Sequence, residues 1–310
     1  MSDHRIKWSI LENEIMSETT RKSTNPSAAS SGTVSLGGEL TVNRLGFGAM
    51  RLTGDGIWGP PRDAAAAITV LRRAIELGVN FIDTADSYGP NVSEELIAEA
   101  LAPYPDDLVI ATKGGWNRPG PNQWTHDASP AHLRQAVEGS LKRLRLDRID
   151  VYQLHVPDPV IPLDASIETL ANLQSEGKIR LIGLSNVTVE HIERARKIVP
   201  IVSVQNRYSF ADREWDYVVD YCERNGIAFI PWFPLGAGSV AGKLLDRIAK
   251  SRQLKPIQVA LAWLLKRSPI MLPIPGTSSV AHLEENVRAG SLQLTEEEYM
   301  DLTGIAELAS

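Results

Sequence analysis

The chain has 310 residues, and its 38 acidic side chains outnumber the 32 basic ones, which gives a formal net charge of −6 at pH 7. This acidic balance argues against a sequence-independent nucleic-acid binder, because such proteins carry a basic surface. No apolar run reaches the roughly 18 residues of a membrane span. The one cysteine, Cys222, excludes an internal disulfide framework and a cysteine-rich zinc site. We therefore predict a soluble protein of the cytoplasm whose partners include neither nucleic acid nor membrane.

The first 32 residues differ in composition from the rest. The stretch 17–32 is rich in Ser, Thr, Asn and Pro and is too polar to build a core. We therefore predict a disordered tail over residues 1–32 and one folded domain over residues 33–310. The tail lacks the apolar centre of a secretory signal, its acidic residues argue against a mitochondrial transit peptide, and Met16 offers a second start within it.

From residue 34 onward, short apolar runs alternate with longer amphipathic ones. Residues 34–42 form two alternating runs about a Gly-Gly turn, which predicts a β-hairpin. Eight further runs are apolar and mostly β-branched, which is typical of parallel strands buried on both faces. They span residues 45–49, 79–84, 108–112, 149–155, 179–185, 201–205, 228–232 and 271–274.

Helical patterns separate these predicted strands. Residues 62–77 carry apolar side chains at three-and-four spacing before Gly78, and Ser129-Pro130 opens another helix. Two more helices end at Gly177 and Gly226. Roughly eight such units predict a (β/α)8 TIM barrel. A doubly wound open sheet is the alternative, but no Gly-x-Gly-x-x-Gly leads from a strand into a helix.

Polar side chains stand at consecutive strand ends, where a barrel carries its chemistry. Asp83 and Tyr88 come with the second strand, Lys113 with the third and His155 with the fourth. Any one of them alone has a structural explanation, such as a loop anchor or a solvated side chain. Their joint placement has none. The next three strands end in Ser185, Asn186, Gln205, Asn206 and the run 232–236.

These four groups suit the addition of a hydride to a carbonyl. Tyrosine has an ordinary pKa near 10, and a nearby ammonium such as Lys113 stabilises its phenolate. Asp83 would keep the lysine charged, a neutral His155 would help to hold the carbonyl, and Tyr88 would give the proton to oxygen. The hydride must come from a bound cofactor, because no side chain carries one. A metal-dependent isomerase is another barrel enzyme, but the ammonium of Lys113 would oppose a cation.

The segment 81–89, Phe-Ile-Asp-Thr-Ala-Asp-Ser-Tyr-Gly, closely resembles the first signature of the aldo-keto reductases. These are (β/α)8 barrels that use NAD(P)H, which also accounts for the missing glycine fingerprint. The resemblance implies a catalytic tetrad of Asp83, Tyr88, Lys113 and His155, with Tyr88 as the general acid. It also implies contacts with the nicotinamide half of the cofactor from Gly48, Ala49, Met50, Asp83, Ser185, Asn186, Gln205, Trp232, Phe233, Pro234, Leu235 and Gly236.

The segment 274–286 resembles the family's site for the adenosine 2′-phosphate and adenine. Its hydroxyls, with the backbone amides that open a helix at Val280, suit an anion. Gly276 stands where many members have lysine and His282 where many have arginine, and both departures remove fixed positive charge. The hydroxyls still favour NADPH as the cofactor. The implied contacts are Gly276, Thr277, Ser278, Ser279, His282, Glu285 and Asn286.

Tryptophans in two Gly- and Pro-rich segments are expected at the mouth of the barrel. One segment follows the first strand, and the other is the unusually long segment 114–129 after the third. They predict a pocket for a flat or aromatic substrate, or a lid, with packing onto the barrel as the alternative. The predicted pocket residues are Ile57, Trp58, Tyr88, Trp116, Trp124 and His155.

Residues 58–63, 183–187 and 275–283 are similar to the pyridoxal-reductase-like bacterial branch of the family. The similarity implies an NADPH-dependent reductase of pyridoxal or another small aldehyde. A keto-sugar or keto-metabolite would suit the same tetrad. The β-subunits of potassium channels share the barrel and the tetrad, so a cofactor-sensing subunit with slow turnover is a further alternative. The short loops and the lack of a docking extension favour the enzyme.

Overall fold

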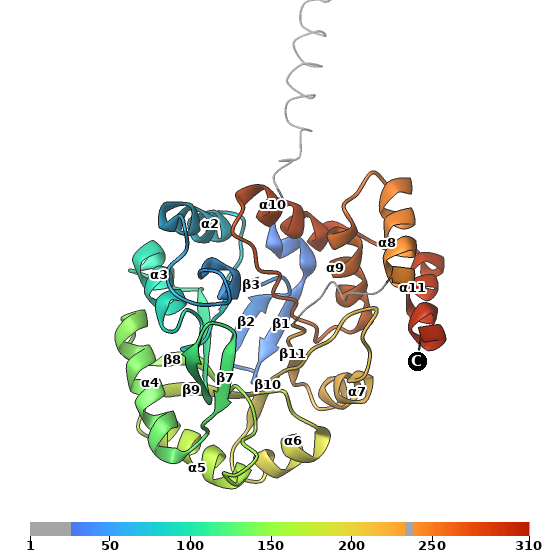
Figure 1. Cartoon of the computed structure of the whole chain (residues 1–310). Helices are drawn as coiled ribbons and strands as arrows, with labels where there is room; N and C mark the ends of the chain where they lie inside the picture. The colour runs from blue at the N-terminus through green and yellow to red at the C-terminus, as the bar shows by residue number, and fades with distance from the viewer. Residues whose placement is uncertain (1–25, 233–238, 310) are drawn as a thin grey trace, which may run out of the picture.

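Seven parallel strands form the centre of the computed structural model, which describes residues 26–232 and 239–309 (Figure 1). They follow one another around the sheet in chain order, and each pairs in parallel with its neighbours. Parallel neighbours need a crossover connection, and a helix lies in each one here. The strands are β3 (Phe47–Gly48), β4 (Phe81–Asp83), β5 (Val109–Gly114), β8 (Ile149–Leu154), β9 (Ile179–Ser185), β10 (Ile201–Gln205) and β11 (Ala228–Phe229).

The segment around Met271 takes the eighth position and closes the sheet. Met271 pairs in parallel with Phe229 of β11, and on the other side Gly46 N, just before β3, donates to Pro273 O at 2.9 Å. The predicted (β/α)8 barrel is thereby confirmed. The predicted eighth strand is present only as this short hydrogen-bonded segment, because Pro273 and Pro275 lack the N–H groups that a longer ladder requires.

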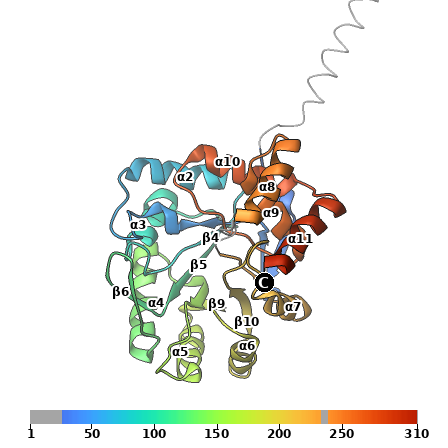
Figure 2. The ribbon, with the colours of Figure 1, turned by 45° about the vertical axis from the view of Figure 1, so that its right-hand side comes forward.

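Helices form the outer layer of the barrel, as Figures 1 and 2 show. Their ends follow the predicted signals. Asp63 and Ser129 cap α2 and α4 by accepting from backbone N–H groups, and Gly78, Gly177 and Gly226 take left-handed φ values after α2, α5 and α7. No helix within the described residues has the length and apolar character needed to cross a membrane. The helices are α2 (Ala64–Glu76), α3 (Val92–Leu101), α4 (Pro130–Leu144), α5 (Leu163–Ser175), α6 (Val189–Arg196), α7 (Asp216–Arg224), α8 (Ser239–Ser251), α9 (Pro256–Arg267), α10 (Val280–Arg288) and α11 (Glu296–Ala309).

The predicted N-terminal hairpin plugs one end of the barrel. Strands β1 (Thr33–Leu36) and β2 (Leu40–Asn43) pair antiparallel, and Gly37 and Gly38 turn between them with φ values of 63° and 75°. Apolar side chains of the hairpin join one buried cluster with the inward-facing side chains of the barrel strands. This cluster includes Val34, Leu36, Val42, Phe81, Val151 and Leu181. The hairpin meets the starts of the strands, so the opposite end stays available for a site.

The described part of the chain begins at residue 26, before the predicted boundary at residue 33. Residues 1–25 lie outside the described part, so the disorder predicted for them stays a prediction. Ala28–Ser31 form a short 3-10 helix, η1, in which Ala28 is fully buried and its N–H donates to Leu77 O at 2.8 Å. The polar composition of this stretch therefore gave no sign that Ala28 packs against the end of α2.

The long segment after β5 forms a second hairpin that the sequence patterns did not predict. Strands β6 (Trp116–Gly120) and β7 (Gln123–His126) pair antiparallel. Pro121 and Asn122 connect them, and Asn122 has a φ of 56°, which asparagine tolerates better than most residues. This hairpin leaves the C-terminal end of β5, so it stands at the end of the barrel that the first hairpin leaves open.

Candidate active site

Four of the predicted residues meet at the C-terminal end of the barrel. Asp83 is the last residue of β4, and Tyr88 lies in the segment that follows it. Lys113 is the next-to-last residue of β5, and His155 directly follows β8. All four side chains are buried. Lys113 Nζ donates to Asp83 Oδ1 at 2.6 Å and to Tyr88 Oη at 3.4 Å. The rings of Tyr88 and His155 lie edge to face with centroids 5.8 Å apart.

Two amides and a backbone carbonyl complete the surroundings of the Asp83–Lys113 pair. Gln153 Nε2 and Gln205 Nε2 donate to Asp83 Oδ2 at 3.2 Å and 2.8 Å, and Lys113 Nζ also donates to Thr84 O at 2.8 Å. Gln205, which we predict to hold the nicotinamide, therefore also supports the acid of the tetrad. Sequence analysis missed Gln153. Its place two residues before His155 was a signal for it, because alternate residues of a strand face the same side.

Burial and the charge of Lys113 set the protonation of the site. Burial alone would lower the pKa of Lys113, but Asp83 and Tyr88 outweigh it and raise that pKa above its usual value. Burial raises the pKa of Tyr88 although Lys113 opposes it, so the phenol is protonated at neutral pH. Burial, together with Lys113, holds the pKa of His155 well below its usual range. The site thus presents a charged amine, a neutral phenol and a neutral imidazole.

Residues that follow β9 and β11 lie beside His155. Asn186 Nδ2 donates to His155 O at 3.0 Å and to Ser185 Oγ at 3.1 Å, and Trp232 Nε1 donates to Asn186 Oδ1 at 3.2 Å. Trp232 remains 36% exposed, so part of its indole is open to a ligand. The structure therefore groups the predicted nicotinamide contacts of these two strand ends. Residues 233–236, predicted to continue the same site, lie outside the described residues.

A cavity of about 980 Å³ contains both predicted halves of the site. At the tetrad end, Tyr88 and His155 share its lining with three of the predicted pocket residues. At the other end it is lined by the start of α10 and the segment before it. The predicted residues in its lining are Gly48, Met50, Ile57, Asp83, Tyr88, Trp116, Trp124, His155, Ser185, Asn186, Gln205, Trp232, Gly276, Thr277, His282, Glu285 and Asn286.

Four predicted contact residues lie outside this lining. Trp58 turns instead toward Arg118, whose guanidinium is 5.6 Å from the indole centroid. Ala49 is fully buried. Ser278 lines a neighbouring cavity, and Ser279 caps α10 by accepting a backbone hydrogen bond at 3.5 Å. Ser278 still lines a cavity, whereas the roles predicted for Trp58, Ala49 and Ser279 require contacts through the backbone or through a neighbouring residue.

The glycine at position 276 has a structural cause. A Cβ atom there would lie 2.4 Å from Gly48 O, and a Cβ at Gly48 would lie 2.6 Å from Ile274 O. The two backbones are therefore in direct contact beside the closure of the barrel, and no side chain fits between them. Arg51 passes close by, with its Cγ 3.5 Å from the same point. A lysine at position 276 has no room in this arrangement.

Sequence analysis also missed cationic residues that line the main cavity. Arg51 is exposed and makes no hydrogen bond or ion pair with any other described residue, and Lys255 lies 4.0 Å from Glu285. Neither lies in a recognised motif, because Arg51 lies in the short 3-10 helix Ala49–Leu52 and Lys255 is the residue before α9. Their positions place positive charge beside Gly276 and beside Glu285 of α10, near the two positions, Gly276 and His282, where the sequence lacks the fixed charges of the family pattern.

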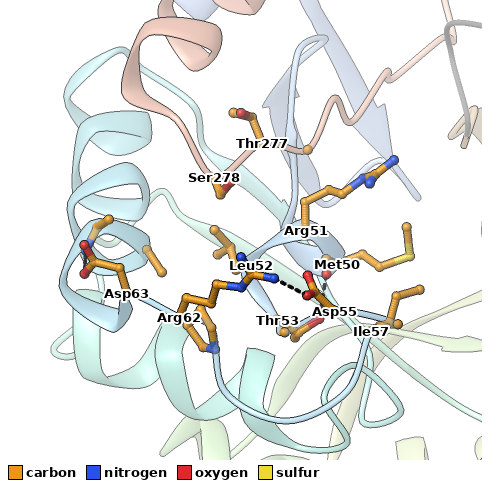
Figure 3. A pocket seen from close by; sticks show the side chains of 16 residues that line it. Met50, Arg51, Leu52, Thr53, Asp55, Ile57, Arg62, Asp63, Thr277 and Ser278 are labelled. Atoms are coloured by element: carbon orange, nitrogen blue, oxygen red, sulfur yellow. Dashed lines mark hydrogen bonds and ion pairs between the residues drawn. The ribbon is translucent and has the colours of Figure 1, made fainter. Parts of the chain in front are cut away.

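A second cavity of about 680 Å³ adjoins the first (Figure 3). It lies between residues 50–57, the start of α2 and the segment before α10, and it shares Arg51 and Thr277 with the main cavity. Arg62 and Asp55 form an ion pair of 2.5 Å among its lining residues, as the figure shows. Both side chains are more than four-fifths exposed, so this pair contributes little to stability.

A buried acidic cluster lies next to the tetrad. Glu94 is fully buried, pairs with Arg143 Nε at 2.6 Å and accepts from Thr112 Oγ1 at 2.6 Å. Asp86 is also buried, and its Oδ1 has no hydrogen-bond partner in the described part of the chain. Burial, with repulsion from Glu94, raises the pKa of Asp86 to about 8. Asp86 is therefore mainly protonated at neutral pH.

We predict that Asp86→Asn becomes more stable relative to the wild type as the pH rises from about 4 to about 8. Over that range the unfolded wild type, with an Asp pKa near 3.9, releases a proton that the folded form keeps. The wild type then loses at most about 1.4 kcal/mol of unfolding free energy per pH unit against the variant. Urea unfolding of both proteins at pH 5 and pH 8 measures this. Equal pH dependence in the two proteins would contradict the raised pKa.

Comparison with known proteins adds an independent result. The profile of the Aldo/keto reductase family matches residues 44–307. An uncharacterized oxidoreductase of Schizosaccharomyces pombe is 51% identical over 285 residues, which cover 91% of this chain and 92% of the relative. Pyridoxine 4-dehydrogenase of Escherichia coli is 50% identical over 284 residues, 89% of this chain and 99% of the relative. An aldo-keto reductase from Klebsiella pneumoniae, solved in complex with NADPH, superposes with a TM-score of 0.75 at 27% identity and covers 88% of this chain and 94% of that one.

Proposed function

Because this chain belongs to the aldo/keto reductase family and is thus an oxidoreductase, we propose that it reduces an aldehyde or ketone to the alcohol with NADPH. The observation that carries the proposal is the buried contact of Lys113 with both Asp83 and Tyr88. This contact lies at one end of a cavity whose volume of about 980 Å³ suits a small-molecule site.

Each residue of the tetrad has one task in the proposed reaction. Tyr88 gives its proton to the carbonyl oxygen while a hydride adds to the carbonyl carbon, so the product is the alcohol. NADPH supplies that hydride when it is bound. Lys113 stabilises the negative charge left on Tyr88 Oη, and Asp83 keeps the lysine in place. The neutral imidazole of His155 holds the carbonyl oxygen. The reverse reaction uses the same groups in the opposite order.

The residues at both ends of the main cavity fit NADPH. Ser185, Asn186 and Gln205 offer the hydroxyl and amide groups that a carboxamide needs, and Trp232 offers an open aromatic face. At the other end, Thr277 stands before the N-terminus of α10, which favours an anion. The NADPH complex of the Klebsiella pneumoniae relative supports the same choice of cofactor.

Arg51 supplies the positive charge that Gly276 cannot. Its side chain lies against Gly276, lines both cavities and has no ionic partner among the described residues. A free guanidinium in this place suits the 2′-phosphate, to which it can donate two hydrogen bonds. We therefore include Arg51 in the proposed phosphate site together with the hydroxyls of Thr277 and Ser278.

Pyridoxal, or another small planar aldehyde, is the substrate that the pocket supports best. Trp116 and Trp124 pack edge to face with centroids 5.9 Å apart, and Trp116 lies 6.4 Å from His155. With Ile57 they give the tetrad end of the cavity an apolar and largely aromatic wall. Pyridoxine 4-dehydrogenase, the relative that matches over 99% of its length, supports the same class of substrate.

The alternative substrates and roles fit fewer observations. A keto-sugar would need hydrogen-bonding groups for its hydroxyls, whereas Ile57, Trp116 and Trp124 present apolar surface. A cofactor-sensing subunit would keep the same tetrad but would oxidise its bound cofactor only once. A metal-dependent isomerase would need a metal site, and among the described residues no three His, Cys, Asp or Glu side chains are grouped in a way that could hold a metal ion. Multiple turnover of a small aldehyde separates the enzyme from the sensor.

We propose the cytoplasm as the compartment of this protein. Cys222, its one cysteine, is fully buried in α7 and forms no disulfide. Burial raises the pKa of its thiol to about 12, so it is an unreactive core residue. A single thiol of this kind suits a reducing environment.

We predict that Tyr88→Phe lowers kcat for aldehyde reduction by about 100-fold or more, because the general acid is lost. NADPH binding, followed by quenching of tryptophan fluorescence, should be unchanged. Tyr217→Phe on the exposed side of α7 is the matched control and should keep wild-type kcat. A loss smaller than about threefold in Tyr88→Phe would remove Tyr88 from the proposed role.

Arg51→Ala is expected to raise the Kd for NADPH about tenfold and to leave the Kd for NADH nearly unchanged, because only NADPH carries the 2′-phosphate. Fluorescence titration with each cofactor measures both constants. Arg148→Ala, which removes an exposed arginine just before β8 at the far end of the barrel, should change neither. An equal rise in Kd for NADPH and NADH would mean that Arg51 contacts a group that the two cofactors share.

The wild type should reduce pyridoxal with kcat/KM at least about tenfold above that for pyridoxal 5′-phosphate or fructose. The physical reason is that the residues lining the aromatic end of the cavity would bury a phosphate or several hydroxyls without partners. Steady-state assays at equal NADPH concentration compare the three, with 4-nitrobenzaldehyde as a generic aldehyde. If pyridoxal is no better than nitrobenzaldehyde, pyridoxal is not the specific substrate.

A further inference from the structure

Arg118 of β6 joins three segments of the substrate end of the barrel. Its Nε donates to Gln123 O at 3.0 Å within its own hairpin, Nη1 donates to Ser87 O at 2.8 Å, and Nη2 donates to Gly56 O at 3.0 Å. The face of the guanidinium lies 3.8 Å from the ring centroid of Trp124. One side chain thus contacts the β6–β7 hairpin, the segment before Tyr88 and the loop after β3.

Each of these segments contributes to the wall of the proposed substrate pocket. The hairpin carries Trp116 and Trp124, the loop carries Ile57, and the segment after β4 carries Tyr88 itself. All of these wall residues lie in the segments that connect barrel strands with the next helices, and none lies in a barrel strand itself. Their distance from Tyr88 is therefore set by contacts between the segments. Backbone hydrogen bonds join these segments in pairs: Gly59 N donates to Gly89 O at 2.6 Å, and Asn122 N donates to Gly56 O at 3.3 Å. Arg118 is the side chain whose three bonds reach all three segments at once.

The chemistry of the junction requires a guanidinium. Three backbone carbonyls from different directions converge on it, and only arginine offers several N–H donors in a fixed planar fork. Arg118 Cζ also lies over the indole ring of Trp124, in a cation–π contact of the kind that arginine makes more often than lysine. A lysine at this position would keep the charge but would bind the three carbonyls with one mobile nitrogen.

The tetrad does not depend on this junction. Lys113 holds Asp83 and Tyr88 through its own buried bonds, and Gln153 and Gln205 hold Asp83 from β8 and β10. Loss of Arg118 therefore loosens the aromatic wall and leaves the proton donor in place. The consequence is a change in which carbonyl compounds bind well, with little change in the chemical step.

We propose, on the basis of the function proposed above, that Arg118 is a positioning residue that sets substrate specificity by clamping the hairpin and the loop against the segment of Tyr88. The clamp holds Trp116, Trp124 and Ile57 together as one apolar wall of the pocket. A planar aromatic aldehyde gains by packing its ring on that wall, whereas a short aliphatic aldehyde does not reach it.

The test compares Arg118→Ala and Arg118→Lys with the wild type on pyridoxal and on propanal. In both variants KM for pyridoxal should rise about tenfold while its kcat stays within about threefold, and kcat/KM for propanal should change less than about threefold. Arg62→Ala is the matched control, because Arg62 is an exposed arginine of the same loop region that makes none of these bonds. It should behave as the wild type does.

Hydrogen–deuterium exchange provides a readout that does not depend on activity. Peptides from residues 54–60 and 116–126 should exchange faster in Arg118→Ala than in the wild type or Arg62→Ala, while peptides of β5 and β8 stay unchanged. Unchanged exchange in both segments, or an equal fall in kcat/KM for pyridoxal and for propanal, would overturn the proposal. If the wild type reduces no carbonyl compound with NADPH, the proposed function fails, and faster exchange of both segments still supports the clamp.

Discussion

The buried ion pair between Lys113 and Asp83 is the interaction on which the site depends. Two charges removed from water are tolerated only when their remaining hydrogen-bonding capacity is used. The amides of Gln153 and Gln205 satisfy the second carboxylate oxygen, and Thr84 O accepts from the ammonium. These groups come from β4 and its end, β5, β8 and β10. The pair therefore exists only because the closed barrel brings those strand ends to one point.

The same ammonium has opposite consequences for its two uncharged neighbours. It partly offsets the effect of burial on Tyr88, whose phenol stays protonated yet has a cation ready beside its oxygen. It adds to the effect of burial on His155, whose imidazole stays neutral. The protonated phenol of Tyr88 and the neutral imidazole of His155 thus lie next to each other because Asp83 holds the charged Lys113 beside them.

The barrel and the segments added to it divide the work. The strand ends and the segment after β4 hold the four residues of the proposed tetrad, and the β6–β7 hairpin and the loop after β3 form the wall around them. Barrel enzymes vary such segments freely, because a strand's connection can lengthen without disturbing the sheet. At the other end of the main cavity, the close approach of Gly48 and Gly276 leaves no room for a side chain at position 276, and Arg51 lies beside it, where we propose that it binds the 2′-phosphate.

The sequence by itself determined the barrel, the helix caps, the first hairpin and the grouping of the four strand-end residues, because hydrophobic period, capping residues and strand order are local properties. It did not reveal the second hairpin, the docking of Ala28, or the contacts of Gln153, Arg51 and Arg118. Gln153 donates to the carboxylate of Asp83, Arg118 donates to backbone carbonyls of two other segments, and Arg51 lies against Gly276, so each meets residues far from it in the chain. Such contacts leave no periodic pattern, so only the closed tertiary structure decides which side chains meet.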